Sequence, residues 1–349
     1  MTTRLASANG SAVGGVSVAS SDLVARLTES SDPTLAYRAQ VLAGALDPES
    51  EKAHTLRAAI ADSPRSRALL SHREPNGTIH LHPYAKWQGP HWTLVSLALL
   101  EYPAGDPTLL PLRDQVYEWL FSRTHLGPPG TVMHPDQPER VRRCASQEGN
   151  AVWSSLRLGL EDERTLTLVE RLIVWQWPDG GWNCDKRPAA RNSSFQETAI
   201  PLRALWVFGM RHGHSGALAA ADRAAELLLS RRLLWRRRDG ALIRPSWGGP
   251  VDHIHCPIQF YDLLFALQVL TESGHAGDPR MADARALLIA KCLPDGGFPC
   301  EVHTAVTRER VTSRGTFADW GPTGRRTSNP FVTLAAWHVL RTPSNGRPA

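Results

Sequence analysis

Four of the five cysteines lie in polar segments between apolar stretches, each beside acidic, basic or histidine residues. Cys144, Cys184, Cys256 and Cys300 are far apart in the chain, and no Cys-x-x-Cys pair occurs. Thiolate sulfur and imidazole nitrogen are preferred ligands of zinc. If the fold gathers these segments, the four cysteines together with His255 or His253 are candidate zinc ligands. The alternative is that the cysteines are small buried residues at helix starts.

Carboxyl groups in apolar surroundings form a second set of reactive candidates. Asp262 lies within an apolar stretch, and Glu197 and Glu148 lie near the starts of two others. A carboxyl group in an apolar cavity has a raised pKa and can protonate an alkene or an epoxide. We take Asp262, Glu197, Glu148 and His255 as catalytic candidates. Helix capping is the alternative for the two glutamates, and a structural contact with an arginine or a helix end is the alternative for Asp262.

Tryptophan is unusually frequent, with 12 residues against 8 phenylalanines and 5 tyrosines. Aromatic faces attract cations, and carbocation chemistry requires such stabilisation. Large rings also fill a wide helical core, which is the alternative use. The aromatic residues that we expect to line a substrate cavity are Trp92, Trp153, Trp206, Phe260 and Tyr261.

The chain is mildly basic, with a formal net charge of +5. Arg142 and Arg143 directly precede Cys144 and could bind a diphosphate through charge-assisted hydrogen bonds, although no Asp-rich magnesium motif accompanies them. The arginine cluster at 231–238 reads as a solvated helix end. Because no basic pattern interleaved with aromatic residues occurs, we expect no nucleic-acid partner.

A repeat of 50 to 60 residues determines which elements must position these side chains. The segment Trp177–Cys184 (WPDGGWNC) is echoed at Leu293–Cys300 (LPDGGFPC), and weaker copies contain Gly77, Gly130 and Gly240. A regular period of this size indicates an array of similar supersecondary units.

Each unit has a helix with one apolar stripe, then an Asp-Gly turn and a loop, then a helix that is apolar on most of its surface. The first helices are expected at 109–122, 165–175, 218–233 and 280–291, and the second helices at 91–100, 147–158, 195–208, 258–271 and 331–340. Helices that are apolar all round are buried, so we expect an inner ring of parallel helices surrounded by outer helices. The starts of the inner helices would then meet at one rim, together with four cysteines. We expect little strand.

Gln176–Trp182 (QWPDGGW) matches the repeat motif of the squalene–hopene and oxidosqualene cyclases, and Asp295–Phe298 (DGGF) matches the variant of the protein prenyltransferase β subunits. The chain therefore resembles a terpenoid cyclase or prenyltransferase-type α/α toroid of about five to six helical hairpins over roughly residues 35 to 341. The resemblance implies an all-α fold, and fold alone does not imply function. It also implies that Trp177 and Trp182 pack between units.

The chain departs from both families at the residues that carry their chemistry. It lacks the Asp-x-Asp-Asp motif of the cyclases and the usual Asp-x-Cys zinc pair of the prenyltransferases, and its length fits a single toroid. Three hypotheses remain: acid-initiated cyclisation or isomerisation of a polyprenyl or other apolar substrate, a zinc-dependent enzyme of the same fold, and a non-catalytic toroid that binds a ligand or a protein.

The termini and composition complete the expectations. Residues 1–21 are small and polar without a secretory pattern, so we expect a flexible tail before one domain at 22–349. We expect a cytoplasmic protein with reduced cysteines and no transmembrane helix. The expected partner is a small apolar or prenyl substrate, which is compatible with peripheral membrane contact.

Overall fold

The computed structural model describes residues 21–127, 137–243, 250–257 and 261–342. The fold is mostly helical, with fourteen α-helices in this part of the chain. The elements are α1 (Ser21–Thr28), α2 (Pro33–Leu42), α3 (Glu51–Ala61), α4 (Pro64–Leu70), α5 (Pro90–Leu99), η1 (Pro107–Leu109), α6 (Leu110–Phe121), α7 (Arg123–Leu126), α8 (Ala145–Leu158), α9 (Glu163–Trp175), α10 (Phe195–His212), α11 (Ser215–Ser230), β1 (His255–Cys256), α12 (Leu263–Leu270), η2 (Thr271–His275), η3 (Pro279–Met281), α13 (Ala282–Ile289), β2 (Val302–His303), β3 (Val306–Thr307), β4 (Gly315–Thr316) and α14 (Pro330–Arg341).

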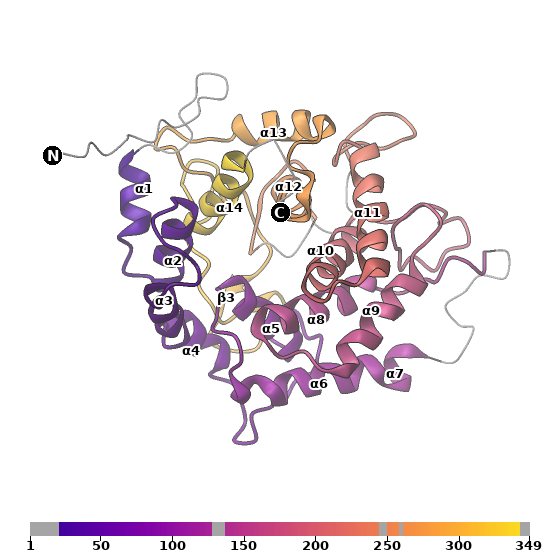
Figure 1. Cartoon of the computed structure of the whole chain (residues 1–349), viewed down its shortest axis with the longest axis horizontal. Helices are drawn as coiled ribbons and strands as arrows, with labels where there is room; N and C mark the ends of the chain where they lie inside the picture. The colour runs from indigo at the N-terminus through magenta and orange to yellow at the C-terminus, as the bar shows by residue number, and fades with distance from the viewer. Residues whose placement is uncertain (1–20, 128–136, 244–249, 258–260, 343–349) are drawn as a thin grey trace.

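Helices α2, α5, α8, α10, α12 and α14 lie toward the middle of the molecule, and α3, α4, α6, α9, α11 and α13 lie at its periphery (Figure 1). Contacts connect the inner helices in the order α5, α8, α10, α12, α14 and α2. The Thr34 hydroxyl of α2 donates to the carbonyl of Leu100 at the end of α5, with an O···O distance of 3.2 Å. This bond links the two ends of the series.

The inner helices are buried on nearly all sides. Every residue of α12, Leu263–Leu270, is buried, and so are the nine residues Pro90–Ala98 of α5. This burial explains why their sequences show little polar periodicity. The predicted second helices at 91–100, 147–158, 195–208 and 331–340 are confirmed as α5, α8, α10 and α14.

The predicted helix at 258–271 was wrong at its start. Residues 258–260 lie outside the described part of the chain, and α12 begins at Leu263. Asp262 precedes it as the N-cap, where its carboxylate accepts a hydrogen bond from the Phe265 amide at 2.8 Å. An N-cap carboxylate satisfies an amide that has no partner within the helix. An apolar run after an Asp is therefore a helix start here.

A glycine lets α8 and α10 approach closely. A Cβ atom on Gly149 would lie 3.0 Å from the Pro201 nitrogen and 3.1 Å from a methyl group of Ile200. Side chains larger than hydrogen would therefore push α8 away from α10. Because the starts of both helices carry candidate site residues, this contact contributes to their spacing.

The Gln176–Trp182 turn ties successive units together. Trp177 Nε1 donates to the carbonyl of Val141 at 2.8 Å, and Trp182 Nε1 donates to the carbonyl of Leu172 at 2.9 Å. Both rings are buried. Gly180 has a φ of 94°, which favours glycine because it has no Cβ atom. The contact of Trp177 with Val141 connects two units, as expected, whereas the hydrogen bond of Trp182 stays within its own unit.

Strand is sparse, as expected. The described residues contain two parallel pairs of two-residue strands, β1 with β2 and β3 with β4. The predicted tail at 1–21 lies almost wholly outside the described residues, which begin with Ser21 of α1. Among the described residues, no helix combines the length and the apolar character that crossing a membrane requires.

Candidate functional site

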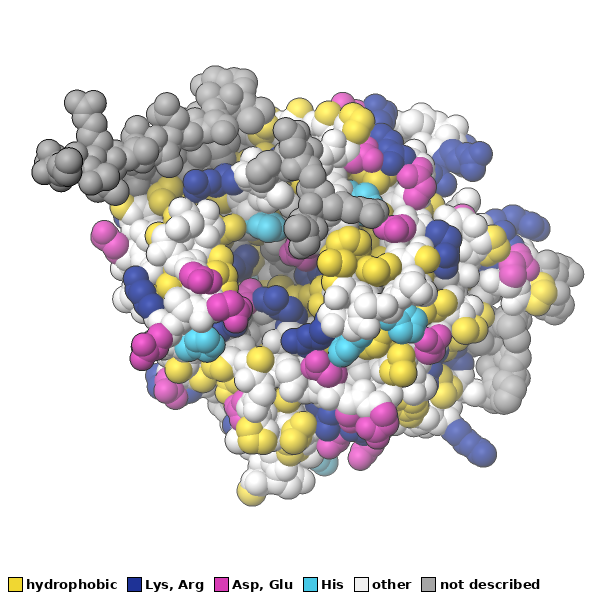
Figure 2. Space-filling model, in the orientation of Figure 1, with side chains coloured by type: hydrophobic (Ala, Val, Ile, Leu, Met, Phe, Trp, Pro, Cys, Tyr) yellow, Lys and Arg dark blue, Asp and Glu magenta, His cyan; other side chains and the backbone are white. Residues whose placement is uncertain are grey.

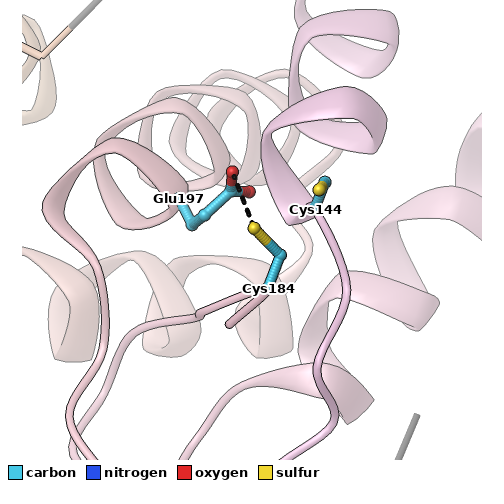
Figure 3. A group of neighbouring side chains, drawn as sticks. All are labelled: Cys144, Cys184 and Glu197. Carbon is cyan, nitrogen blue, oxygen red and sulfur yellow. Dashed lines mark hydrogen bonds between the residues drawn. The ribbon is translucent and has the colours of Figure 1, made fainter. Parts of the chain in front are cut away.

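Cys144, Cys184 and Glu197 place three potential ligand atoms within 4.8 Å of one another (Figure 3). The Cys184 thiol lies 3.8 Å from Glu197 Oε1. The Cys144 thiol also interacts with the Cys184 thiol. Two sulfur atoms and a carboxylate at this separation form a donor set of the kind that zinc accepts.

Three segments position this Cys144–Cys184–Glu197 cluster. Cys144 is the N-cap of α8, and Glu197 lies in the first turn of α10 behind the N-cap Ser194. A parallel bridge between Arg142 and Asn183 holds the two cysteine-bearing segments side by side. The cluster thus lies at the adjacent starts of two inner helices, where partly positive helix ends favour anionic groups.

Glu197 is almost fully buried, with 5% of its surface exposed. The Ser146 amide donates to its Oε2 at 2.8 Å, and the Ser146 hydroxyl donates to its Oε1 at 3.1 Å. Burial raises the pKa of Glu197 to about 7, although the two hydrogen bonds from Ser146 oppose the rise. The hydrogen bond to Cys184, burial and the charge of Glu197 raise the pKa of the Cys144 thiol. Without a cation, this site disfavours the anionic forms of its own groups.

Lys86 and Tyr84 lie beside the cluster. Burial lowers the pKa of Lys86, while the charges of Cys144 and Glu197 raise it. Burial raises the pKa of Tyr84 well above its usual range, and the same charged groups add to that shift. The Lys86 ammonium lies 5.2 Å from the ring centroid of Trp87. One cationic side chain therefore faces three potential anions.

Our sequence reasoning missed Lys86 and Tyr84. They lie in the loop before α5, which is the position that the cysteines occupy in later units. The signal that could have found them is this repeat position, because the loop before α5 approaches the segments before α8 and α10. Ser146, another residue that we missed, is the second residue of α8.

The other two rim cysteines form a separate pair. The Cys256 and Cys300 thiols share a hydrogen bond, and this bond together with burial raises the pKa of Cys256 well above its usual range. β1 and β2 hold the pair, with Cys256 opposite His303 in the register. The expected cluster of four cysteines is therefore two pairs, and the predicted metal ligands Cys256 and Cys300 do not belong to the three-ligand group.

The arrangement of the two pairs follows the repeat. Cys184 and Cys300 each follow an Asp-Gly-Gly turn by the same number of residues. Each pairs with a cysteine before the inner helix of the preceding unit, Cys144 before α8 and Cys256 before α12. Equivalent loops thus meet in the same way at two places.

Asp262 forms hydrogen bonds with His255 and also caps the start of α12. Asp262 is fully buried and accepts hydrogen bonds from the His255 amide at 2.7 Å and from the His255 ring Nδ1 at 3.1 Å. With the bond from Phe265, its carboxylate accepts three hydrogen bonds. The structure therefore supports the structural alternative for Asp262, and gives His255 the role of its partner.

Glu148 forms ion pairs and does not belong to the Cys144–Cys184–Glu197 cluster. Its Oε1 lies 3.0 Å from His125 Nε2 and 3.4 Å from Arg171 Nη1. Because His125 belongs to α7 and Arg171 to α9, this carboxylate faces the outer helices. Of the three predicted acids, only Glu197 belongs to the group with Cys144 and Cys184.

Arg142 and Arg143, which we expected to bind an anion, instead donate hydrogen bonds to backbone carbonyls. Arg142 is buried and donates to the carbonyls of Asp185 at 2.7 Å and Ala190 at 3.0 Å. Arg143 donates to the carbonyl of His125 at 2.6 Å. The Arg142 guanidinium, which also donates to the Gln137 side chain, therefore has few donors left for a diphosphate, whereas Arg143 uses one donor in the bond to His125.

The predicted aromatic lining is divided among several roles. Trp92 is buried against Trp87, with ring centroids 4.3 Å apart, and lies near Tyr84 at 5.2 Å. The Tyr261 hydroxyl donates to the carbonyl of Leu233 at 2.7 Å, so this ring anchors the chain after α11. Trp206 is half-buried. Trp153 lies under the guanidinium of Arg203, and Phe260 lies outside the described residues.

A groove on the outer face does not coincide with the cluster. It has a volume of about 620 Å³ and lies between the turn at 178–180 and the end of α11. Arg232 and Arg236 in its wall pair with Asp283 at 2.7 Å and Asp239 at 3.0 Å. This agrees with the expectation of a solvated arginine cluster.

No family model matches the chain, and no curated protein is significantly similar to it. Its chemistry must therefore be inferred from the site itself. Cys144, Cys184 and Glu197 fit zinc because they supply sulfur and oxygen donors from three segments of a buried rim.

Proposed function

We propose that the chain is an α/α toroid and a zinc-dependent enzyme that acts on a largely apolar substrate. The series of contacts from α5 to α2 and the bond between Thr34 and Leu100 support the toroid. The cluster of Cys144, Cys184 and Glu197 carries the functional proposal.

Charge balance supports a bound divalent cation. Two thiolates and one carboxylate carry three negative charges, and placing them within 4.8 Å of one another without a counter-ion is unfavourable. A divalent cation removes two of these charges, and the nearby ammonium of Lys86 balances the third. Deprotonated ligands and metal binding are coupled, so the cation would also lower the pKa values that burial raises.

Three protein ligands leave a coordination position for water or a substrate atom, as in catalytic rather than structural zinc sites. Zinc in such a position supplies Lewis acidity and activates a bound thiol or water. Ser146 orients the Glu197 carboxylate through two hydrogen bonds. Tyr84 and Trp92 provide an aromatic wall, which favours an apolar substrate.

Elemental analysis tests the proposal directly. We expect about one zinc per chain in the purified protein and loss of that zinc in the Cys144→Ser/Cys184→Ser double variant. The Cys256→Ser/Cys300→Ser double variant is the matched control and should keep its zinc. A metal-free wild-type protein that binds no added zinc would disprove the metal centre.

Acid-initiated cyclisation or isomerisation is the second candidate function. The observation that favours it is that Glu197, unlike Glu148, forms no ion pair among the described residues, while burial raises its pKa to about 7. Turnover of a polyprenyl substrate by zinc-free protein, lost in Glu197→Gln, would support this function over the first. In both proposals the protein acts in the cytoplasm, where its five unbridged cysteines stay reduced.

A further inference from the structure

A second group of charged side chains comes from the inner helices, apart from the cysteine cluster. Its members are Arg38 of α2, Arg157 of α8, Arg203 of α10, Glu272 of η2 and His338 of α14. Burial lowers the pKa values of Arg38, Arg203 and His338, and the charge of Glu272 opposes each shift. The charge of Glu272 therefore acts on side chains from four other elements.

Arg203 is the most unusual member because it is buried without a polar partner. Only 5% of its surface is exposed, and it forms no hydrogen bond or ion pair with any residue that the structure describes. Its guanidinium carbon lies 3.5 Å from the ring centroid of Trp153 and 5.5 Å from that of Phe265. Burial lowers its pKa to about 10, so it stays charged at neutral pH.

The other side chains of this group do not compensate the positive charge of Arg203. Arg157 already pairs with Glu101 at 2.5 Å. Glu272 and Arg38 form no ion pair within the described ranges, and the buried His338 Nε2 has no hydrogen-bond partner there. The space-filling view shows a hollow near the middle of the molecule, where dark blue, magenta and cyan side chains gather (Figure 2).

A buried guanidinium normally has hydrogen-bond acceptors, because removing a charge from water without compensation is costly. Aromatic faces compensate only in part, since a cation–π contact leaves the N–H groups of the guanidinium unsatisfied. Arg203 and Arg38 give two positive charges against the one negative charge of Glu272. The missing component is an anion with oxygen acceptors.

We propose that Arg203, with Arg38 and His338, binds an oxyanion, namely the phosphate or carboxylate group of a ligand that enters between the inner helices. This binding site goes beyond the proposed zinc chemistry and does not depend on it. Two guanidinium groups on different helices provide several N–H donors for such a group. The rings of Trp153 and Phe265 favour a ligand whose remainder is apolar.

Calorimetric titration of the full chain with sodium phosphate and with sodium octanoate, each against sodium chloride at equal ionic strength, tests the inference. We expect saturable binding of at least one of the two oxyanions, about tenfold weaker or more in Arg203→Met. Arg237→Gln is the matched control, because Arg237 is exposed on the outer face and has no ion pair among the described residues. Binding of phosphate alone would identify a phosphate ligand, and binding of octanoate alone would identify a carboxylate.

Two further variants keep the test decisive. Glu272→Gln removes the competing carboxylate, so it should bind the oxyanion severalfold more tightly than the wild type. Arg203→Met should melt at or above the wild-type temperature without ligand, because it replaces an unpaired buried charge. Absence of saturable oxyanion binding to the wild type, or equal affinity in Arg203→Met, would overturn the inference. Because these titrations need no zinc, their failure leaves the metal proposal intact.

Discussion

Cys184 and Glu197 are separated by a loop and a helix start, yet the Cys184 sulfur lies 3.8 Å from a carboxylate oxygen of Glu197. The turn at Gln176–Trp182 begins the loop, and the bridge between Arg142 and Asn183 holds the loop beside the Cys144 segment. Ser194 then caps the start of α10, whose first turn carries Glu197. The repeat that builds the fold therefore also assembles the candidate centre.

Replacing Glu197 by Gln should weaken zinc binding while preserving the fold. Glutamine has nearly the same shape and keeps an oxygen acceptor for Ser146 but no negative charge. Outer-shell changes at zinc sites cost roughly 10- to 100-fold in affinity, so loss of a ligand charge should cost at least as much. Competition with a zinc-binding dye measures the affinity, and circular dichroism controls for folding. Wild-type affinity in this variant would remove Glu197 from the ligand set.

Asp262→Asn should destabilise the protein without changing its zinc content. The Asp262 carboxylate accepts three hydrogen bonds, one from the Phe265 amide at the start of α12 and two from His255. The asparagine side chain has only one oxygen acceptor, so it cannot accept all three bonds. Loss of buried, charge-assisted hydrogen bonds predicts a decrease of about 1–3 kcal/mol in the free energy of unfolding. Urea denaturation gives the decrease. Unchanged stability together with abolished turnover would instead restore Asp262 as a catalytic acid.

Gly149→Ala should also destabilise the fold, although alanine is the better helix former. Its Cβ would lie 3.0 Å from the backbone of Pro201, which cannot move without displacing α10. Overpacking of this kind costs roughly 1–3 kcal/mol. Gly216→Ala is the matched control, because the nearest atom that its Cβ would meet belongs to the His214 side chain, at 3.2 Å, and not to the backbone of another helix. If both variants melt at the same temperature, the close packing of α8 against α10 is not limiting.

Protonation of His91 should make the protein less stable in acid. Burial lowers the pKa of His91 to about 4 from its usual 6.5, and its Nε2 lies 3.1 Å from the carbonyl oxygen of Gln147. Nε2–H therefore donates, and a second proton on the buried Nδ1 would find no acceptor among the described residues.

Because the folded-state pKa is depressed, this stability is fully present above pH 6.5 and is lost as the pH falls toward 4. The pKa difference corresponds to a loss of about 3 kcal/mol through this group below pH 4, of which about 2 kcal/mol is lost by pH 5.0. Chemical denaturation at pH 7.5 and 5.0 measures that part of the loss, and His91→Gln should show a smaller decrease between the two pH values. An equal decrease in both proteins would assign the acid sensitivity to other groups.

The helices were predictable from local sequence because their signals are local. Apolar positions every three or four residues, caps such as Asn329 and glycine turns such as Gly180 act within a few residues. The same local signals placed the start of α12 too early. An apolar segment favours a helix along its whole length, but α12 begins only after its N-cap Asp262.

The candidate site was only partly predictable. Cys144, Cys184 and Glu197 were recognised individually, and the repeat placed them on one rim. Which cysteines pair depends on how loops of adjacent units lie side by side, as in the bridge between Arg142 and Asn183. One-dimensional spacing contains no such distance.

Sequence alone therefore determined the helical repeat and the types of reactive side chain on its rim. Tertiary structure decided that the four cysteines form two pairs, that the charge of Lys86 acts on one of these pairs, and that Arg203 is buried against Trp153 without an acceptor among the described residues. The physical reason is the distance along the chain over which each interaction acts. Capping and periodicity act along a few residues of chain, whereas desolvation and charge pairing depend on every element that surrounds a side chain.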